Sequence, residues 1–152
     1  MDASLLLDHY RMQACSRQWR GFLQAMADEF ADALPDAELA RLMARMGERF
    51  AIAHPLAPAD DLAVLQAACN GIWSNLDWGS AQFSEQPGEV TIEPLGAPLS
   101  ALLGAGASWA GGFLEGVYRG WFQAAGMLPG LDVQHLPGTS ADVSRYVLAR
   151  VA

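Results

Sequence analysis

The stretch Gly104–Ala125, GAGASWAGGFLEGVYRGWFQAA, decides how this chain folds. Residues four apart share one side of a helix. Two sides of this stretch are large and apolar: Trp109, Phe113, Val117, Trp121 and Ala125 on one, Ala110, Leu114, Tyr118 and Phe122 on the other. A third side is small: Gly104, Ser108, Gly112, Gly116, Gly120 and Ala124. Because an ordinary surface helix is apolar on one side only, the pattern predicts a buried central helix.

The small side predicts close approach of another backbone. Each glycine inside a helix costs roughly 0.5–1 kcal/mol relative to alanine, so three in register suggest a large return from packing. The partner is either another element of the same chain or a second copy, and the sequence leaves both open. The candidates for an oligomer interface or for close packing are Gly112, Gly116, Gly120, Trp78 and Trp121.

The fourth side of the central stretch is polar. It carries Glu115 and Arg119, four apart with the acid first, which are expected to pair on a stripe that faces water.

Composition predicts one soluble domain spanning residues 1–152. Apolar residues make up 52% of the chain, and its formal charge is −8. That charge argues against nucleic acid as a partner. The start, MDASLLLDHY, has too short an apolar run for a secretory signal. The uncharged run Pro94–Leu114 is long enough for a membrane span, but prolines and glycines interrupt it, so we expect a cytoplasmic protein.

Three amphipathic helices are predicted ahead of the central one, over Leu5–Ala33, over Asp36–Ile52, and from Asp60 or Asp61 to Leu76. In the first, the apolar positions recur at the spacing of one buried side: Trp19, Phe22, Leu23, Met26 and Phe30. The second carries an arginine row at four-residue steps: Arg41, Arg45 and Arg49. The sequence does not decide whether this row is solvated or meets an acidic surface of a partner.

The apolar period then changes to that of strands. Asp77–Gln86 and Val90–Glu93 flank a Pro-Gly turn and predict a hairpin. Leu131–Leu136 and Val143–Val151 predict a second strand pair, with a helical turn expected at Leu99–Leu103. The predicted fold is therefore α+β: three N-terminal helices, a β-hairpin, the central Gly-rich helix and a C-terminal β-hairpin, forming helices packed on a small antiparallel sheet.

The sequence contains no recognisable catalytic or metal-binding motif. The histidines are isolated from one another, so no metal site and no cofactor is expected: His9, His54 and His135. Cys15 and Cys69 are expected to be reduced, although spacing alone does not exclude a disulfide. Asp77 and Glu115 lie near the densest aromatic stretches and are the pair that a glycosidase hypothesis would use.

Three segments together resemble the BcsD family, the D subunits of bacterial cellulose synthase: Cys15–Leu23, CSRQWRGFL; Leu76–Gly79, LDWG; and Phe113–Phe122, FLEGVYRGWF. The resemblance covers nearly the whole chain. It implies a non-catalytic accessory protein that forms an octamer, a tetramer of dimers, enclosing passages for nascent β-1,4-glucan chains. The residues expected to face a passage are those of the N-terminal segment: Asp2, Ala3, Ser4, Leu5 and Leu6.

The resemblance also implies a place and partners. The expected location is cytoplasmic, at the inner-membrane synthase complex, with the periplasm as the alternative. The expected partners are other components of the synthase complex and a proline-rich accessory protein. Two hypotheses from other classes stay open beside this one: an α+β sensor that encloses haem or a small apolar ligand, and a glycoside hydrolase.

Overall fold

A computed structural model describes residues 2–3, 5–6, 9–10, 15–104, 107–136 and 144–151. Its helices and strands follow the order α2 (Arg17–Ala33), α3 (Asp36–Ala53), α4 (Leu62–Asn75), β1 (Ser80–Gln86), β2 (Glu89–Leu95), α5 (Leu99–Leu103), η1 (Ser108–Gly111), α6 (Gly112–Ala124), β3 (Leu131–Leu136) and β4 (Arg145–Arg150). The predicted α+β fold is confirmed. None of the described helices is long and apolar enough to cross a bilayer.

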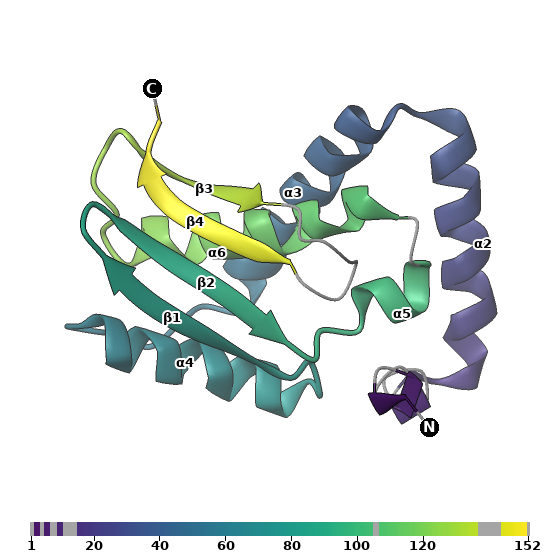
Figure 1. Ribbon diagram of the computed structural model, residues 1–152, viewed down its shortest axis with the longest axis horizontal. Helices are drawn as coiled ribbons and strands as arrows, with labels where there is room; N and C mark the ends of the chain where they lie inside the picture. Colours follow the sequence, from purple (N-terminus) through teal and green to yellow (C-terminus); the bar gives the residue numbers. More distant parts are fainter. Residues whose placement is uncertain are drawn as a thin grey trace.

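The four strands form one antiparallel sheet in the order β1-β2-β4-β3. Both predicted hairpins are present, and they join where β2 pairs with β4. Alternate residues of the strands point to one face, which is the buried one: Ala81, Phe83, Ile92, Val133, Tyr146 and Leu148. In Figure 1, α6 crosses behind this sheet and α4 runs along its β1 edge. Helix α2 lies at the other end of the molecule from the sheet.

The small side of α6 lies against α3 of the same chain. A methyl group built on Gly116 would overlap the carbonyl oxygen of Ala44, and one on Gly112 would overlap that of Ala40. The contact is reciprocal, because a methyl group on Gly47 of α3 would overlap the carbonyl oxygen of Phe113. The two backbones therefore approach so closely that only glycine fits at these positions.

Two helices begin later than the sequence predicts. The first predicted helix, Leu5–Ala33, is interrupted before α2: the hydroxyl of Ser16 accepts a hydrogen bond from Gln18 N at 3.3 Å and caps the new helix. Residues 11–14 lie outside the described part of the chain. The central helix begins at Gly112, after the turn η1, and Gly104 takes a φ of +103° that ends α5 before it.

The α3–α6 contact generates a stability prediction. Gly116→Ala is expected to destabilise the protein by about 1–3 kcal/mol, because the overlap with Ala44 outweighs the better helix propensity of alanine. Gly71→Ala in α4 is the matched control. Its added methyl group meets open space, so it should stabilise the protein by about 0.5–1 kcal/mol. Urea unfolding measures both, and a neutral Gly116→Ala would show that the contact is loose.

Candidate assembly surface

The apolar side of α2 is only partly covered by the rest of the chain. Ala27 is buried, and Leu23, Met26 and Phe30 are half-buried. Trp19 and Phe22, by contrast, are 57% and 59% exposed. The prediction that these two rings are buried is therefore wrong for a single copy. The first turns of α2 extend past α5, and the described N-terminal residues beside them leave both rings largely exposed (Figure 1).

An apolar groove of about 240 Å³ runs between α2 and the body of the protein. Its lining comes from α2, α3, α5, α6 and the segments beside them, and every lining residue is apolar: Leu23, Met26, Ala27, Phe30, Met43, Met46, Trp78, Leu99, Leu102, Leu103, Trp109 and Phe113. The exposed rings of Trp19 and Phe22 pack edge to face at 6.0 Å and extend the apolar side of α2 beyond this groove. We name these two rings and the groove the α2 surface.

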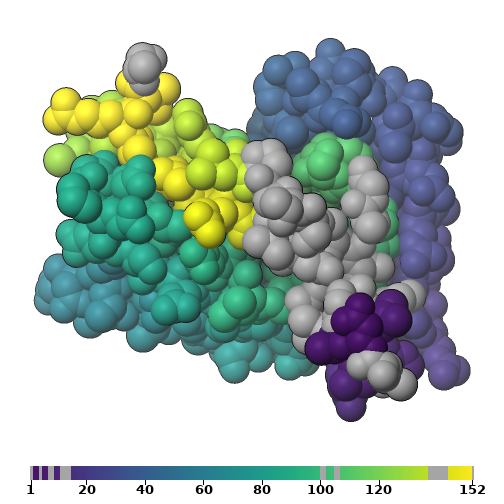
Figure 2. Space-filling model, in the orientation of Figure 1, coloured from purple at the N-terminus to yellow at the C-terminus, as the bar shows by residue number. Residues whose placement is uncertain are grey.

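The N-terminal residues predicted to face a glucan passage lie on the outside of a single copy. Asp2, Ala3, Leu5 and Leu6 are all exposed, while Ser4 lies outside the described residues. Figure 2 shows this segment on the surface at the end of the molecule where α2 begins. The segment is therefore accessible, and its contact with glucan stays a prediction.

The residues predicted for an oligomer interface or for close packing are buried or half-buried within a single copy, and Gly120 and Trp121 also line an apolar pocket beside the loop after α3. Gly112 and Gly116 lie against the α3 backbone, and a methyl group on Gly120 would come within 2.7 Å of the Ala51 side chain. Trp121 is 2% exposed, and its indole N–H donates to the carbonyl of His54 at 2.9 Å. Of the five candidates, only Trp78 lines the α2 surface. A role for these residues between copies stays a prediction.

The other tryptophans and tyrosines around α6 form an aromatic core. Trp78 stacks on Trp73 at 5.4 Å, and the Trp73 indole N–H donates to the Tyr118 hydroxyl at 3.0 Å. The Tyr146 hydroxyl donates to the carbonyl of Gly111 at 2.7 Å. Burial raises the pKa of both tyrosines well above the ordinary value. Trp73, Tyr118 and Tyr146 are structural, because they are buried and their polar atoms are hydrogen-bonded within the core.

The polar side of α6 is only partly exposed: Gln123 faces water, but Glu115 and Arg119 are half-buried against β3, so the prediction of a water-facing stripe holds only in part. Arg119 bonds Glu115 at 3.1 Å as predicted, but its Nε also donates to Asp132 of β3 at 2.6 Å. The second carboxylate oxygen of Glu115 accepts from the backbone N–H of His135 at 2.8 Å. These contacts of Glu115 and Arg119 with Asp132 and His135, which we call the polar seam, join α6 to β3.

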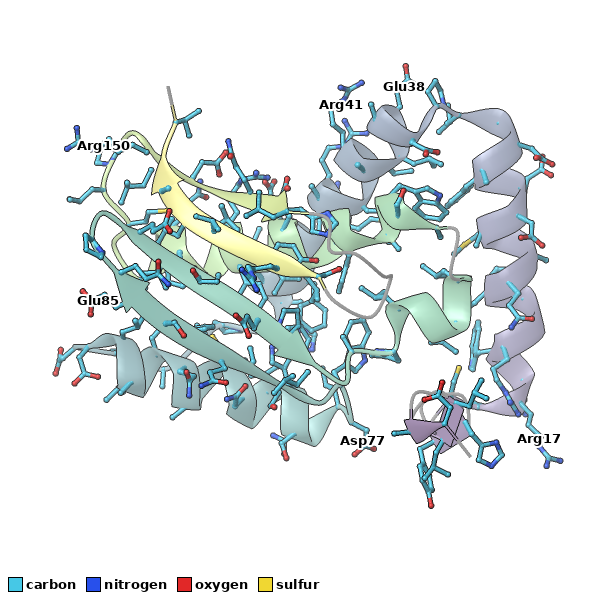
Figure 3. All side chains as sticks on the ribbon, in the orientation of Figure 1. Arg17, Glu38, Arg41, Asp77, Glu85 and Arg150 are labelled. Carbon is cyan, nitrogen blue, oxygen red and sulfur yellow. The ribbon has the colours of Figure 1, made fainter. Side chains whose placement is uncertain are left out.

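The two acids of the glycosidase hypothesis are not brought together. Both oxygens of Glu115 are engaged in the seam with β3. Asp77 follows α4 with a φ of +58°, and its exposed side chain points away from the body of the protein (Figure 3). The geometry of a carboxylate pair across a scissile bond is absent from these two residues.

The described residues provide little support for a metal site or for a catalytic cysteine. No three His, Cys, Asp or Glu side chains gather there as metal ligands. Cys15 and Cys69 are both free thiols, and burial raises the pKa of the Cys69 thiol to about 12. A thiol that stays protonated in this way is a poor nucleophile.

Side chains from helices cap both edges of the sheet. On β1, the amide of Asn70 accepts from Ala81 N at 2.7 Å and donates to Ala81 O at 2.9 Å. On β3, Arg119 donates to the carbonyl of Val133 at 3.0 Å, and Glu115 accepts from His135 N. A strand of another molecule would have to displace these bonds, so the edges are protected against pairing where they are capped.

The capped edge can be tested at Asn70. Asn70→Ala leaves the N–H and C=O of Ala81 without their partners and is expected to destabilise the protein by about 1–3 kcal/mol. Asn75→Ala makes the same change at the exposed last residue of α4 and should alter stability by less than about 0.5 kcal/mol. Equal effects in urea unfolding would show that the Asn70 bonds add nothing.

Comparison with known proteins gives one family. The family model for the D subunit of cellulose synthase matches residues 5–148, which is nearly the whole chain. A search of curated proteins found no match. The matched range includes all three segments that carry the resemblance in the sequence, as well as α2 and the α3–α6 core. This chain belongs to the family of cellulose synthase D subunits.

Proposed function

We propose that this chain is a non-catalytic accessory subunit of the bacterial cellulose synthase complex that assembles with copies of itself to organise synthase units or guide nascent glucan chains. Membership of the family supports the link to cellulose synthesis. The observation that carries self-assembly is the α2 surface, because Trp19 and Phe22 expose large rings at the edge of a wholly apolar groove. Contiguous apolar surface of this kind marks interaction sites.

The proposed assembly is the tetramer of dimers that the family resemblance implies. It acts in the cytoplasm at the inner-membrane complex, with a proline-rich accessory protein as a further partner. The described N-terminal residues, 2–3 and 5–6, lie beside the first turns of α2, so assembly through α2 would bring N-terminal segments of several copies near one another. Such a gathering of exposed N-terminal segments is the arrangement that a shared glucan passage requires.

The non-catalytic role is supported by the contacts of the acidic and hydroxyl side chains around α6, which bind other parts of the same chain. Glu115 and Asp132 bind Arg119, and the Tyr118 and Tyr146 hydroxyls are engaged within the core. These side chains fasten helices and strands to one another and present no free acid, base or nucleophile.

The α2 surface can be tested with the double variant Trp19→Ser and Phe22→Ser. We expect a smaller particle by light scattering at micromolar concentration, because the apolar contact between copies is lost. The thermal midpoint of the separated protomer should change little, since both rings are exposed within it.

Leu128→Ser is the matched control, because Leu128 is an equally exposed apolar residue (69%) in the loop before β3, away from α2. It should keep the mass of the wild type. A double variant of wild-type mass would place the contact between copies elsewhere, and a wild type that stays monomeric would contradict self-assembly itself.

A further inference from the structure

The arginine row of α3 is exposed and has no partner within the described part of this chain. Arg41, Arg45 and Arg49 follow one another at four-residue steps, and none forms an ion pair with another described residue. Like charges at this spacing destabilise a helix by a few tenths of a kcal/mol per pair. In a chain with a formal charge of −8, three of the nine basic residues are concentrated here. The row is thus a basic stripe on an acidic protein.

Two of these arginines border a hollow that can receive a side chain. A space of about 340 Å³ lies between α3 and α6, with Ala40 and Ala44 as small residues in its wall. Arg119, on the α6 side, is already committed to Asp132 and Glu115. Glu48 and Glu115 also line the hollow, and both pair with Arg119. The charges around it without a partner among the described residues are therefore the guanidinium groups of Arg41 and Arg45, which suit carboxylates.

The same chain presents an acidic row of matching spacing. Asp28 and Asp32 lie four residues apart on α2, with Glu29 beside them, and all three are exposed and have no ion-pair partner among the described residues. Residues four apart on a helix are separated by about 6 Å along the axis, both in this row and between Arg41 and Arg45. The two rows are complementary in charge and in spacing.

We propose that the arginine row of α3 in one copy binds the acidic row of α2 in a second copy. Within one copy the rows do not meet, because no ion pair joins them on their consecutive helices. A two-fold contact would form this pairing twice, because Arg41 and Arg45 of each copy would face Asp28 and Asp32 of the other. This inference rests on the proposed self-assembly and adds a second, charged contact on the side of α2 away from Trp19 and Phe22.

The two opposite sides of α2 contribute different kinds of contact to the assembly. The exposed rings and the groove supply apolar area, which stabilises association without fixing direction. The charged rows penalise misaligned contacts, because like charges then face each other. The pairing also makes assembly sensitive to salt, since exposed charges are screened beyond about 10 Å at 0.1 M ionic strength.

Charge reversal on either row tests the pairing. The variants are Arg41→Glu with Arg45→Glu, Asp28→Arg with Asp32→Arg, and all four changes together. Sedimentation at low salt should show self-association weakened about tenfold or more for each double reversal and restored to within about threefold of wild type in the fourfold swap. Wild-type assembly should weaken as salt rises.

Arg150→Glu is the matched control. Arg150 is an exposed arginine at the end of β4, and Figure 3 shows it on the opposite side of the molecule from α2. Reversing it should leave self-association unchanged. Circular dichroism melting of every variant checks the fold, and Arg45→Gln, a milder change at the same position, should give a smaller loss than the double reversal.

The outcomes separate this inference from the function on which it rests. Double reversals that assemble as wild type does, or a fourfold swap that fails to restore assembly, overturn the pairing of these rows and leave self-assembly standing. Loss of assembly in Arg150→Glu as well would show a general charge effect and also overturn the pairing. A wild type that remains monomeric at every salt concentration contradicts both.

Discussion

The close contact between α3 and α6 is the constraint on which the rest of the structure depends. Gly116 lies on Ala44, and Gly47 lies on Phe113, so each helix provides glycine where the other backbone approaches. With its small side against α3, α6 turns its large apolar sides toward the sheet and the aromatic core. Tyr118 then reaches Trp73, and Trp121 reaches the loop after α3. The contact thus fixes where the sheet, the aromatic core and the polar seam lie.

This arrangement leaves apolar surface exposed on α2. The core around α6 is closed within one copy, and the sheet edges carry side-chain caps from α4 and α6. Growth by strand pairing is therefore disfavoured at the capped positions. The first turns of α2, with Trp19 and Phe22, remain exposed in a single copy of this member of the cellulose synthase D subunit family.

Much of the fold follows from local patterns in the sequence. The four-residue rows of the central helix predicted that it is buried and that its small side meets another backbone, and the Pro-Gly turn predicted the first hairpin. The pattern also identified Glu115 and Arg119 as a pair. Asp132 and His135, which complete that seam from β3, could not be predicted because they depend on how a distant strand is placed.

The errors have a common physical origin. A periodic apolar pattern tells which side of a helix avoids water, but it does not tell what covers that side. Trp19 and Phe22 fit the pattern of α2 and yet are exposed, because α2 extends past the element beneath it. The interruption at Ser16 was missed because apolar spacing continues across it, and the caps by Asn70 were missed because a polar residue on a helix gives no sign of a strand partner.

We propose that one copy completes its α3–α6 core alone and that a second copy covers α2. Hydrogen exchange followed by mass spectrometry at several protein concentrations tests this most directly. The amides of α3 and α6 should exchange only through global unfolding, whereas those of residues 17–26 should exchange by local opening in dilute protein and gain protection as concentration rises. Strong protection of residues 17–26 that is already complete in the dilute monomer, or early exchange along α6, would contradict the account.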